Sequence, residues 1–280
     1  MGDPTMTEPR LTVALTFDHD ALSDGVRRGD PPVKLSHAEF GPRIGVPRIL
    51  DVLAREGIES TWFVPGHSLG TFPDNTAAIL AGGHELAAHG WYHEDFSELS
   101  RDEARDVLAR SRDALATAAG VAPSGFRAPY WALAPGTLAL VEEAGFGYDS
   151  SLMAGDVRPY RVRHGDRHSV VDGTTWGAEG TLIEVPVYWA LDDWPHFEPG
   201  PGRSGLATPS AVLEIWTEEL RWAWEHEPGG LVTLTMHPEC IGRAHRMVVL
   251  ERFIAAARSL DGVEFARLDR ALEARGLLSR

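Results

Sequence analysis

The sequence predicts an α/β fold in which a single domain forms a TIM-like (β/α) barrel of seven or eight strands. Short apolar runs alternate with amphipathic helical stretches along most of the 280 residues, a pattern typical of parallel α/β proteins. Several runs are apolar at almost every position, as in strands buried on both faces. The alternation allows a closed barrel or an open doubly wound sheet. We favour the barrel because no glycine-rich phosphate loop follows the first run.

Eight runs have the length and composition of strands. We predict these strands, in chain order, over residues 11–17, 58–64, 84–88, 124–128, 146–150, 181–187, 231–236 and 263–267. In a parallel barrel the carboxyl ends of the strands meet at one rim, where active sites lie. The residues that follow each run are therefore the first place to look for function.

The helices between these strands have recognisable ends. Residues 100–103, from Ser to Glu, have the spacing of a capping box, and Gly120 is placed to end the helix that they begin. Residues 208–209, Thr followed by Pro, predict another helix start. Gly57 and Gly145 each follow a further helical run.

Two segments break the alternation of strands and helices. Residues 151–180 are rich in Arg, His, Asp and Gly and show little apolar periodicity, and residues 195–207 are rich in Pro and Gly. We interpret both as long loops. A lid over the site and an ordinary surface loop are equally good interpretations of such segments.

The composition excludes several classes of function. The chain has 26 basic and 41 acidic side chains and a net charge of −15, which disfavours nucleic acid and membrane partners. The single cysteine forms no internal disulfide, and no apolar run approaches the roughly 18 residues of a membrane span. The first ten residues lack the features of a signal peptide. We therefore expect a soluble, cytoplasmic protein.

Ionisable residues follow the predicted strands repeatedly. The first strand runs into Asp-His-Asp at 18–20, the second into Pro-Gly-His at 65–67 and the third into residues 89–93, which begin and end with His. Arg-Ala-Pro-Tyr at 127–130 follows the fourth strand, and His-Pro-Glu at 237–239 follows the seventh. Because charge scattered at random would not gather at one rim, this pattern predicts an active site there.

Two histidine pairs have the spacing of zinc ligands. His89 and His93 are four residues apart, so both imidazoles face the same way on a helical turn. His164 and His168 have the same spacing, but three neighbouring arginines would repel a cation and no strand precedes them. We therefore expect the metal at the first pair.

Asp18 and Asp20 leave the first strand on the same side, because they are separated by one residue. Such a pair can divide the work, one carboxylate binding a cation and the other taking a proton. An N-cap or a turn is the alternative interpretation. An Asp with two His leaves a coordination position open for water, whose pKa a metal ion lowers to near 7. His237 could protonate a leaving nitrogen, and Asp18 is the natural partner for Arg127.

The strand ends, taken in order, resemble the motifs of the polysaccharide deacetylase (NodB-homology) family, whose fold is a distorted (β/α) barrel. The similar runs are TFDHD at 16–20, HGWYH at 89–93, RAPY at 127–130 and LTMH at 234–237, within an expected domain over residues 11–270. YWALDDW at 188–194 and YDSSLM at 148–153 look most like the subgroup with cytoplasmic peptidoglycan-deacetylase-like and allantoinase-like members.

The resemblance implies a role for each residue of the site. The metal ligands would be Asp20, His89 and His93, and the ion a divalent metal, with Zn²⁺ favoured. Asp18 would be the general base, oriented by Arg127, and His237 the general acid. The backbone N–H of Tyr130 would help to hold the oxyanion. Asp193 would orient His237, although Asp149 is a rival for that role.

The implied activity is hydrolysis of a non-peptide C–N bond, most simply removal of an N-acetyl group from an amino sugar of a small molecule or glycan. His19 separates the two aspartates that are adjacent in the usual motif. The expected cytoplasmic location also differs from that of exported cell-wall enzymes. A ring-opening hydrolase of a cyclic amide or ureide, with or without a metal, is therefore the alternative. A carbohydrate-binding protein without catalysis is a third.

Several other residues have two interpretations. Four tryptophans close to the motifs could stack on a substrate ring or pack in the core: Trp91, Trp131, Trp189 and Trp194. Three more on one predicted helix suggest core or a subunit interface, and with it a homo-oligomer: Trp216, Trp222 and Trp224. Cys240 is interpreted as a small buried hydrophobe rather than a nucleophile, and His84 as a residue that shapes the start of the third strand.

Overall fold

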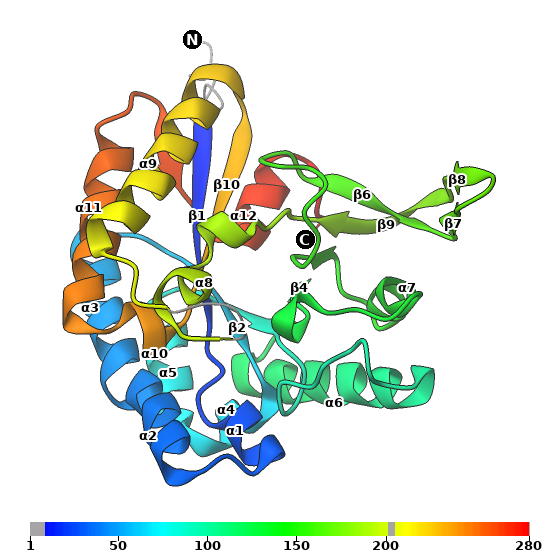
Figure 1. Ribbon diagram of the computed structural model, residues 1–280, viewed down its shortest axis with the longest axis horizontal. Helices are drawn as coiled ribbons and strands as arrows, with labels where there is room; N and C mark the ends of the chain where they lie inside the picture. The colour runs from blue at the N-terminus through cyan, green and yellow to red at the C-terminus, as the bar shows by residue number, and fades with distance from the viewer. Residues whose placement is uncertain (1–8, 201–204, 280) are drawn as a thin grey trace.

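The computed structural model describes residues 9–200 and 205–279, and its centre is a curled, mostly parallel sheet (Figure 1). The strands are β1 Leu11–Asp18, β2 Thr61–Val64, β3 Glu85–Ala88, β4 Gly125–Phe126, β5 Tyr148–Asp149, β6 Tyr160–His164, β7 Arg167–Ser169, β8 Gly173–Thr175, β9 Ala178–Glu184, β10 Gly230–Met236 and β11 Val263–Phe265. All eight predicted strands are present, several of them shorter than expected. The predicted α/β fold, a barrel-like single domain, is confirmed.

The strand order is β10-β1-β2-β3-β4-β5-β9-β6, so the sheet forms part of a barrel rather than a closed one. β1 lies in the middle, parallel to β10 along seven residue pairs from Leu11↔Gly230 to Phe17↔Met236. Its other edge pairs with β11 at its start and with β2 at its end. β1 is therefore hydrogen-bonded on both edges and buried at all eight residues, which explains its continuously apolar sequence.

The gap between the two ends of the sheet is spanned by connecting segments. The N–H of Leu231 on β10 donates to the carbonyl oxygen of Val157, which precedes β6. Asp192, which follows β9, forms an isolated parallel bridge with Thr235 of β10. These contacts bring the segments before β6 and after β9 to the free edge of β10.

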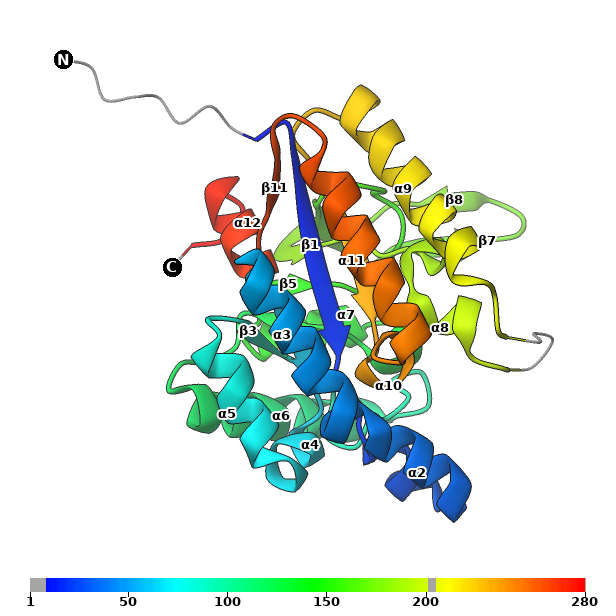
Figure 2. The same cartoon turned by 90° about the vertical axis from the view of Figure 1, so that its left-hand side faces the viewer.

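The outer face of the sheet is covered by helices (Figure 2). In chain order, the helices of the described residues are α1 Ser23–Arg28, α2 Pro32–Phe40, the π-helix η1 Gly41–Gly45, α3 Val46–Glu56, α4 Gly66–Thr71, α5 Pro73–Ala81, α6 Arg101–Ala119, the 3₁₀ helix η2 Pro129–Trp131, α7 Thr137–Glu143, the 3₁₀ helix η3 Trp189–Leu191, α8 Asp193–Phe197, α9 Pro209–His226, α10 Pro238–Ile241, α11 Ala244–Arg258 and α12 Leu268–Ala274. Within the described residues, no helix is both long and apolar enough to cross a membrane.

The helix ends follow local sequence signals. Ser100 accepts a hydrogen bond from the N–H of Glu103, whose side chain bonds back to Ser100, and Gly120 ends α6 in the left-handed conformation. Thr208 caps α9 with Pro209 at its first position. These predicted ends are confirmed.

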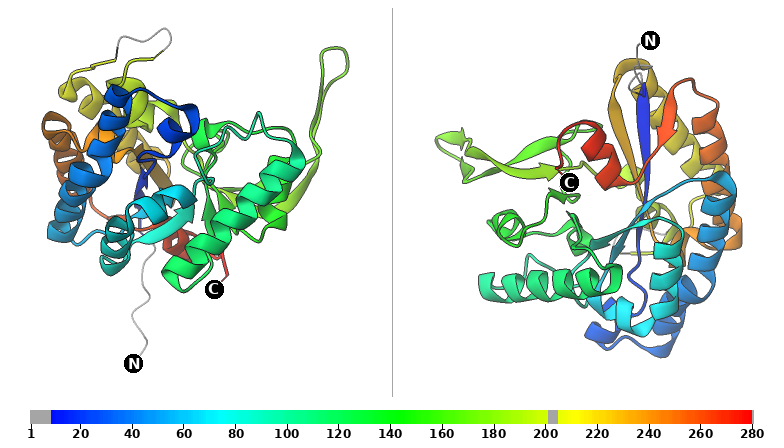
Figure 3. Two further views of the ribbon diagram at one scale, coloured as in Figure 1. Left: turned by 90° about the horizontal axis from the view of Figure 1, so that it is seen from below. Right: turned by 180° about the vertical axis from the view of Figure 1, so that it is seen from behind.

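The prediction of an irregular loop over residues 151–180 is wrong for most of that segment. β6 pairs antiparallel with β9, and β7 with β8, so that residues 160–177 form an arm that projects from the body (Figures 1 and 3). In β6, Tyr160, Val162 and His164 alternate with exposed arginines, which is the two-residue period of a strand. The second predicted loop, 195–207, includes the end of α8, and its residues 201–204 lie outside the described residues.

Candidate active site

The two-residue period of the strands brings four predicted site residues to the concave face of the sheet. On β1, alternate residues such as Val13 and Leu15 pack against the helices, whereas Ala14 belongs to a second cluster within the curl. Asp18 continues the series of Ala14 on that inner side. His89 stands two residues after Ala87, and Arg127 two residues after Gly125, so by the same count both side chains point to the inner side. His237 stands six residues after Leu231 and points to that side too. The predicted strand ends therefore converge on one side of the sheet.

Arg127 is the central support of this group. It is fully buried, and its Nη1 donates to Oδ1 of Asp18 at 2.7 Å and to Oγ1 of Thr16 at 2.9 Å. Nε and Nη2 donate to the carbonyl oxygen and Oγ of Ser150, both at 2.9 Å. The guanidinium carbon lies 4.0 Å from the ring centroid of Phe63. Arg127 therefore fixes Asp18 through one carboxylate oxygen and leaves Oδ2 to face the other site residues.

Asp20, His89 and His93 form a buried group whose ligand atoms lie within 4.8 Å of one another. Nε2 of His89 is 3.4 Å from Oδ1 of Asp20, and Nε2 of His93 is 3.3 Å from Oδ2 of Asp20. Nδ1 of His89 lies 2.8 Å from the carbonyl oxygen of Arg127, which requires the proton on Nδ1 and leaves the lone pair of Nε2 directed at Asp20. Such a second hydrogen bond is typical of a metal-ligating histidine.

The charge balance of this group is what a cation site requires. Burial tends to raise the pKa of Asp20, but His93 and His89 outweigh burial, so the pKa lies below its ordinary value. Burial lowers the pKa of His89 and keeps its imidazole neutral. Oδ1 of Asp20 is buried and accepts no hydrogen bond from the described residues. Burial opposes protonation of His93, but Asp20 outweighs burial and raises its pKa, so a cation bound there has to displace that proton. A carboxylate oxygen and two imidazole nitrogens are donors that suit Zn²⁺ and similar divalent ions.

The loop that carries both histidines is irregular, so the expected helical turn between His89 and His93 is wrong. Gly90 and His93 both have positive φ, of 70° and 60°. The carboxylate of Glu94 accepts hydrogen bonds from the N–H groups of Trp91 and Tyr92, at 2.8 and 3.0 Å, and so closes the loop. A left-handed conformation is costly at a histidine. It persists here because the surrounding contacts fix the loop.

His237 contacts Asp193 and not Asp149. Its Nδ1 lies 2.7 Å from Oδ1 of Asp193, and its backbone N–H also donates to that carboxylate. Burial opposes protonation of His237, but Asp193 outweighs it, and the pKa of His237 is raised well above its usual value. Nε2 of His237 is 4.0 Å from Oδ2 of Asp18. His237 is therefore held as an imidazolium that faces the carboxylate on the opposite side of the site.

Asp149 lies on the other face of the sheet. Its neighbours Tyr148 and Ser150 point to the inner side, where Ser150 binds Arg127, so Asp149 points outward. It accepts hydrogen bonds from Ser151 and is paired in register with Glu184 of β9. Burial raises the pKa of Asp149 to about 6. Its side chain thus contributes to the β5–β9 contact rather than to the imidazole.

Aromatic rings contact two of the site histidines, His93 and His237. Tyr130 has φ 57° in η2, and its ring packs edge-on against His93 at 4.4 Å between centroids. Among the described residues, no acceptor binds the N–H of Tyr130. Trp131 and Trp189 lie 4.3 Å apart, and the ring of Trp194 is 5.2 Å from that of His237. Trp194 therefore lies beside the site, and Trp131, which follows Tyr130 in η2, packs against Trp189 of η3.

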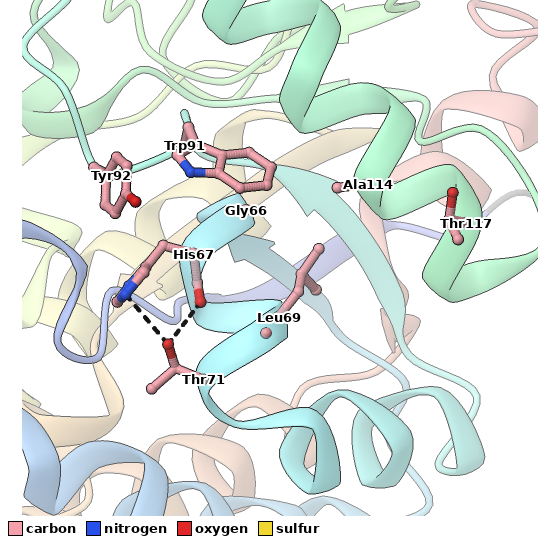
Figure 4. A pocket seen from close by; sticks show the side chains of 9 residues that line it. Gly66, His67, Leu69, Thr71, Trp91, Tyr92, Ala114 and Thr117 are labelled. Atoms are coloured by element: carbon pink, nitrogen blue, oxygen red, sulfur yellow. Dashed lines mark hydrogen bonds between the residues drawn. The ribbon is translucent and has the colours of Figure 1, made fainter.

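Trp91 belongs to a pocket behind the histidine loop (Figure 4). The pocket has a volume of about 490 Å³ and lies between α4 and α6, with Tyr92 and His67 facing each other at its edge. A Cβ at Gly66 would lie 2.2 Å from the ring of Trp91, so only glycine fits there. Arg110 stacks on Trp91 at 3.6 Å. Trp91 is thus a packing residue of the loop between the two histidines.

A model of the polysaccharide deacetylase family matches residues 5–148, about half of the chain. The chain is also 32% identical to a peptidoglycan deacetylase of Helicobacter pylori over 271 residues, covering 91% of this chain and 92% of the relative. The chain belongs to the polysaccharide deacetylase family. It is therefore a hydrolase that acts on C–N bonds other than peptide bonds.

Solved structures of similar proteins share the fold described above. The crystal structure of a Mycobacterium smegmatis protein, assigned as a polysaccharide deacetylase, superposes with a TM-score of 0.82 at 36% identity, covering 100% of this chain and 96% of that one. The crystal structure of Puue allantoinase superposes with a TM-score of 0.80 at 21% identity, covering 97% and 93%. At that identity the second likeness shows the fold alone.

Other residues singled out from the sequence lie away from this deacetylase-family site or contact it only from behind. His164 is bound to Glu142 at 2.5 Å and His168 to Thr174, so the second histidine pair does not converge. Nδ1 of His84 lies 3.1 Å from the N–H of Ser60, joining the starts of β2 and β3. Cys240 is buried behind Asp193, and burial raises the pKa of its thiol well above the usual value, which disfavours a thiolate.

Sequence reasoning missed several groups around the site. Thr16 and Ser150 hold Arg127, and a count of two-residue alternation from Asp18 could have found the first. His19 is buried, neither ring nitrogen has a hydrogen-bond partner among the described residues, and burial lowers its pKa to about 4. Asp192 caps α8 through the N–H of Trp194. Glu239, two residues after His237, is buried, and burial raises the pKa of its carboxyl well above the ordinary value.

Proposed function

We propose that the chain is a metal-dependent deacetylase that removes the N-acetyl group from an amino sugar of a glycan. One observation carries this proposal: the carboxylate of Asp18 and the imidazole of His237 face each other beside the buried group of Asp20, His89 and His93. Hydrolysis of an amide requires a general base, a general acid and a cation site that lie next to one another, as these residues do. The name of the Helicobacter pylori relative, peptidoglycan deacetylase, supports the glycan substrate.

The residues present fit a divalent cation, and Zn²⁺ suits them best. Two imidazole nitrogens and one carboxylate oxygen are three protein ligands, which leaves a position for water or substrate. The buried Oδ1 of Asp20 without a hydrogen-bond donor is consistent with a cation as its missing partner. A divalent ion held there supplies Lewis acidity toward the carbonyl and lowers the pKa of water.

Asp18 is the proposed general base. The ion pair with Arg127 fixes Oδ1 of the carboxylate, so Oδ2 is available to take the proton of an attacking water. Oδ2 lies 3.7 Å from Nε2 of His89, on the side of the cation site. A water held at the cation site would therefore lie next to Oδ2, which is the arrangement that proton transfer from water to Asp18 requires.

His237 is the proposed general acid. Asp193 holds the proton on Nδ1 and stabilises the imidazolium, so Nε2 carries the proton that the departing amine needs. The backbone N–H of Tyr130, placed in η2 by a positive φ, is the proposed donor to the oxyanion. Amide cleavage then yields an amine and a carboxylic acid, with Asp18 protonated and His237 neutral. Return of the proton from Oδ2 of Asp18 to Nε2 of His237, 4.0 Å away, directly or through a water, regenerates both groups.

The sugar-binding surface is proposed to be the aromatic side of this site. Tyr130, Tyr188 and Trp189 are 41%, 51% and 47% exposed, which is unusual for such large rings. The ring of Trp189 packs against that of Trp131 at an interplanar angle of 41°, so the two rings support each other between η2 and η3. Flat aromatic faces beside hydrogen-bonding groups suit the apolar face of a pyranose ring.

Metal analysis of the purified protein and two variants tests the proposal. We expect about one divalent ion per chain in the wild type and in His168→Ala, which serves as a matched control on the arm, and loss of that ion in His89→Ala. Acetate release from N-acetylglucosamine oligomers should be lost in His89→Ala and after chelation, and should return on addition of Zn²⁺. A metal-free wild type that opens a cyclic ureide after exhaustive chelation would instead support the ring-opening alternative.

A further inference from the structure

Within the described part of the chain, the arm formed by residues 160–177 contacts the rest of the molecule only at its base. His164 contacts Glu142 of α7 and ties the arm to the body. From residue 166 to residue 177, every hydrogen bond, ion pair and ring contact that the structure describes stays within residues 163–177. Figure 3 shows the arm standing clear of the helices in both views. Isolated two-stranded ribbons are only marginally stable in water, so an arm of this length gains from a partner.

The tip of the arm exposes apolar side chains. Val170 and Val171 are 106% and 85% exposed in the turn, and Trp176, between β8 and β9, is 63% exposed. Arg163 covers one face of Trp176 at 4.5 Å, and His168 packs against its edge. Exposed apolar groups gathered on a projecting element mark an interaction surface rather than a solvated loop.

A hollow on α9 has the complementary properties. It has a volume of about 420 Å³ and is lined by Ile215, Glu218, Glu219, Arg221, Trp222 and Glu225. Ile215 and Trp222 are 40% and 49% exposed, so their apolar surface also lacks cover within the described residues. Three glutamates and one arginine make the rim of this hollow acidic.

Charge favours a second copy of this chain as the occupant. The arm has three arginines and two aspartates, a net charge of +1, whereas the whole chain carries −15. Two copies of an acidic chain repel each other. Because the arm is positively charged, it is attracted to the acidic surface of the other copy. An arm with an apolar tip and basic stem therefore fits an apolar hollow with an acidic rim.

We propose that the arm of one copy docks on α9 of a second copy, with Val170 and Val171 entering the hollow between Ile215 and Trp222. Arg167 and His168 of the arm then face Glu219 and Glu225 of the rim, since Glu218 is already paired with Arg221 at 2.7 Å. The contact does not depend on the proposed catalytic residues, since none of them lies on the arm or on α9. Reciprocal docking of two arms gives a closed dimer, and successive docking gives a ring.

Sedimentation of the full chain across a range of concentrations is the first test. We expect self-association of the wild type, and we expect Val170→Asp with Val171→Asp to weaken it at least about tenfold. Val33→Asp is the matched control, because Val33 is an 80% exposed valine on α2. Circular dichroism and thermal melting verify that the variants fold. A wild type that stays monomeric, or an oligomer that the double variant leaves intact, overturns the proposal.

Cysteine pairing between differently tagged chains tests the location. Cys240 is buried, so a chain with Val171→Cys and another with Ile215→Cys each present one reactive thiol. Mixing the two under oxidising conditions should give a disulfide that joins the two tags. Val33→Cys mixed with Ile215→Cys is the control and should not. If the double variant dissociates the oligomer but no disulfide joins residues 171 and 215, the arm binds elsewhere and the assignment to α9 is overturned.

Discussion

Replacing Asp193 with asparagine tests the His237–Asp193 pair, because the change removes the carboxylate charge and keeps the size of the side chain. Asp193 is fully buried and lies 2.7 Å from Nδ1 of His237. An opposite charge within 4–6 Å moves a pKa by about 1–3 units, so we expect the pKa of His237 to fall by that amount. The proposed acid must be protonated, so activity is present below the pKa of His237 and lost as the pH rises through it.

A lower pKa moves this loss of activity to lower pH. The pH profile of kcat for acetate release should therefore lose its alkaline part about 1–3 pH units earlier in Asp193→Asn than in the wild type. At pH values where the variant is deprotonated and the wild type is not, kcat should fall by about a hundredfold or more. NMR titration of labelled histidines, with the His237 signal assigned from His237→Gln, measures the same pKa directly.

Asp149→Asn is the matched control for this experiment. Asp149 is equally buried, but it binds Ser151 and pairs with Glu184 on the outer face of the sheet. The titration of His237 should be unchanged in this variant even if its melting temperature falls. An unchanged alkaline limb in Asp193→Asn, or a shift caused by Asp149→Asn in its place, would refute the orientation of His237 by Asp193.

Three further variants probe other parts of the site. Arg127→Met leaves the Asp18 carboxylate buried without its partner and should lower the free energy of unfolding by about 3–5 kcal/mol in urea titrations; an unchanged midpoint contradicts this. Cys240→Ala should keep wild-type kcat, because the thiol is buried with a raised pKa; more than tenfold loss in a stably folded variant would make the thiol a nucleophile. Trp189→Ala should raise KM about two- to tenfold for N-acetylglucosamine oligomers and keep kcat, and the reverse pattern speaks against stacking.

Local signals made much of the fold predictable. The run over residues 11–17 is apolar because β1 is hydrogen-bonded on both edges and buried on both faces. The capping box of α6 is a contact among near neighbours in sequence, so spacing alone found it. The convergence of the residues that follow the strands was predictable, because parallel strands place their carboxyl ends at the same edge of a sheet whatever the order of the strands.

Contacts between distant segments were not predictable in the same way. Asp149 and Asp193 both stand near motif residues in the sequence. Only the fold shows that Asp193, at the start of α8, contacts His237, whereas Asp149, on β5, points to the outer face of the sheet. Alternation from Tyr148 would have assigned Asp149 to the outer face once the inner side of β5 was known. The pairing of β6 with β9 was missed because charged residues occupy its exposed positions, so the segment lacks the apolar runs of the buried strands.

The position of β1 in the sheet has a consequence for biosynthesis. β1 begins at Leu11, yet one edge of it pairs with residues 230–236 and part of the other with residues 263–265. As the chain leaves the ribosome, this apolar strand therefore waits for almost all of the remaining sequence before its hydrogen bonds are complete. An unpaired apolar strand is prone to associate with other chains in the meantime. Chains that end before residue 230 would consequently fail by aggregation during synthesis, well before any question of catalysis arises.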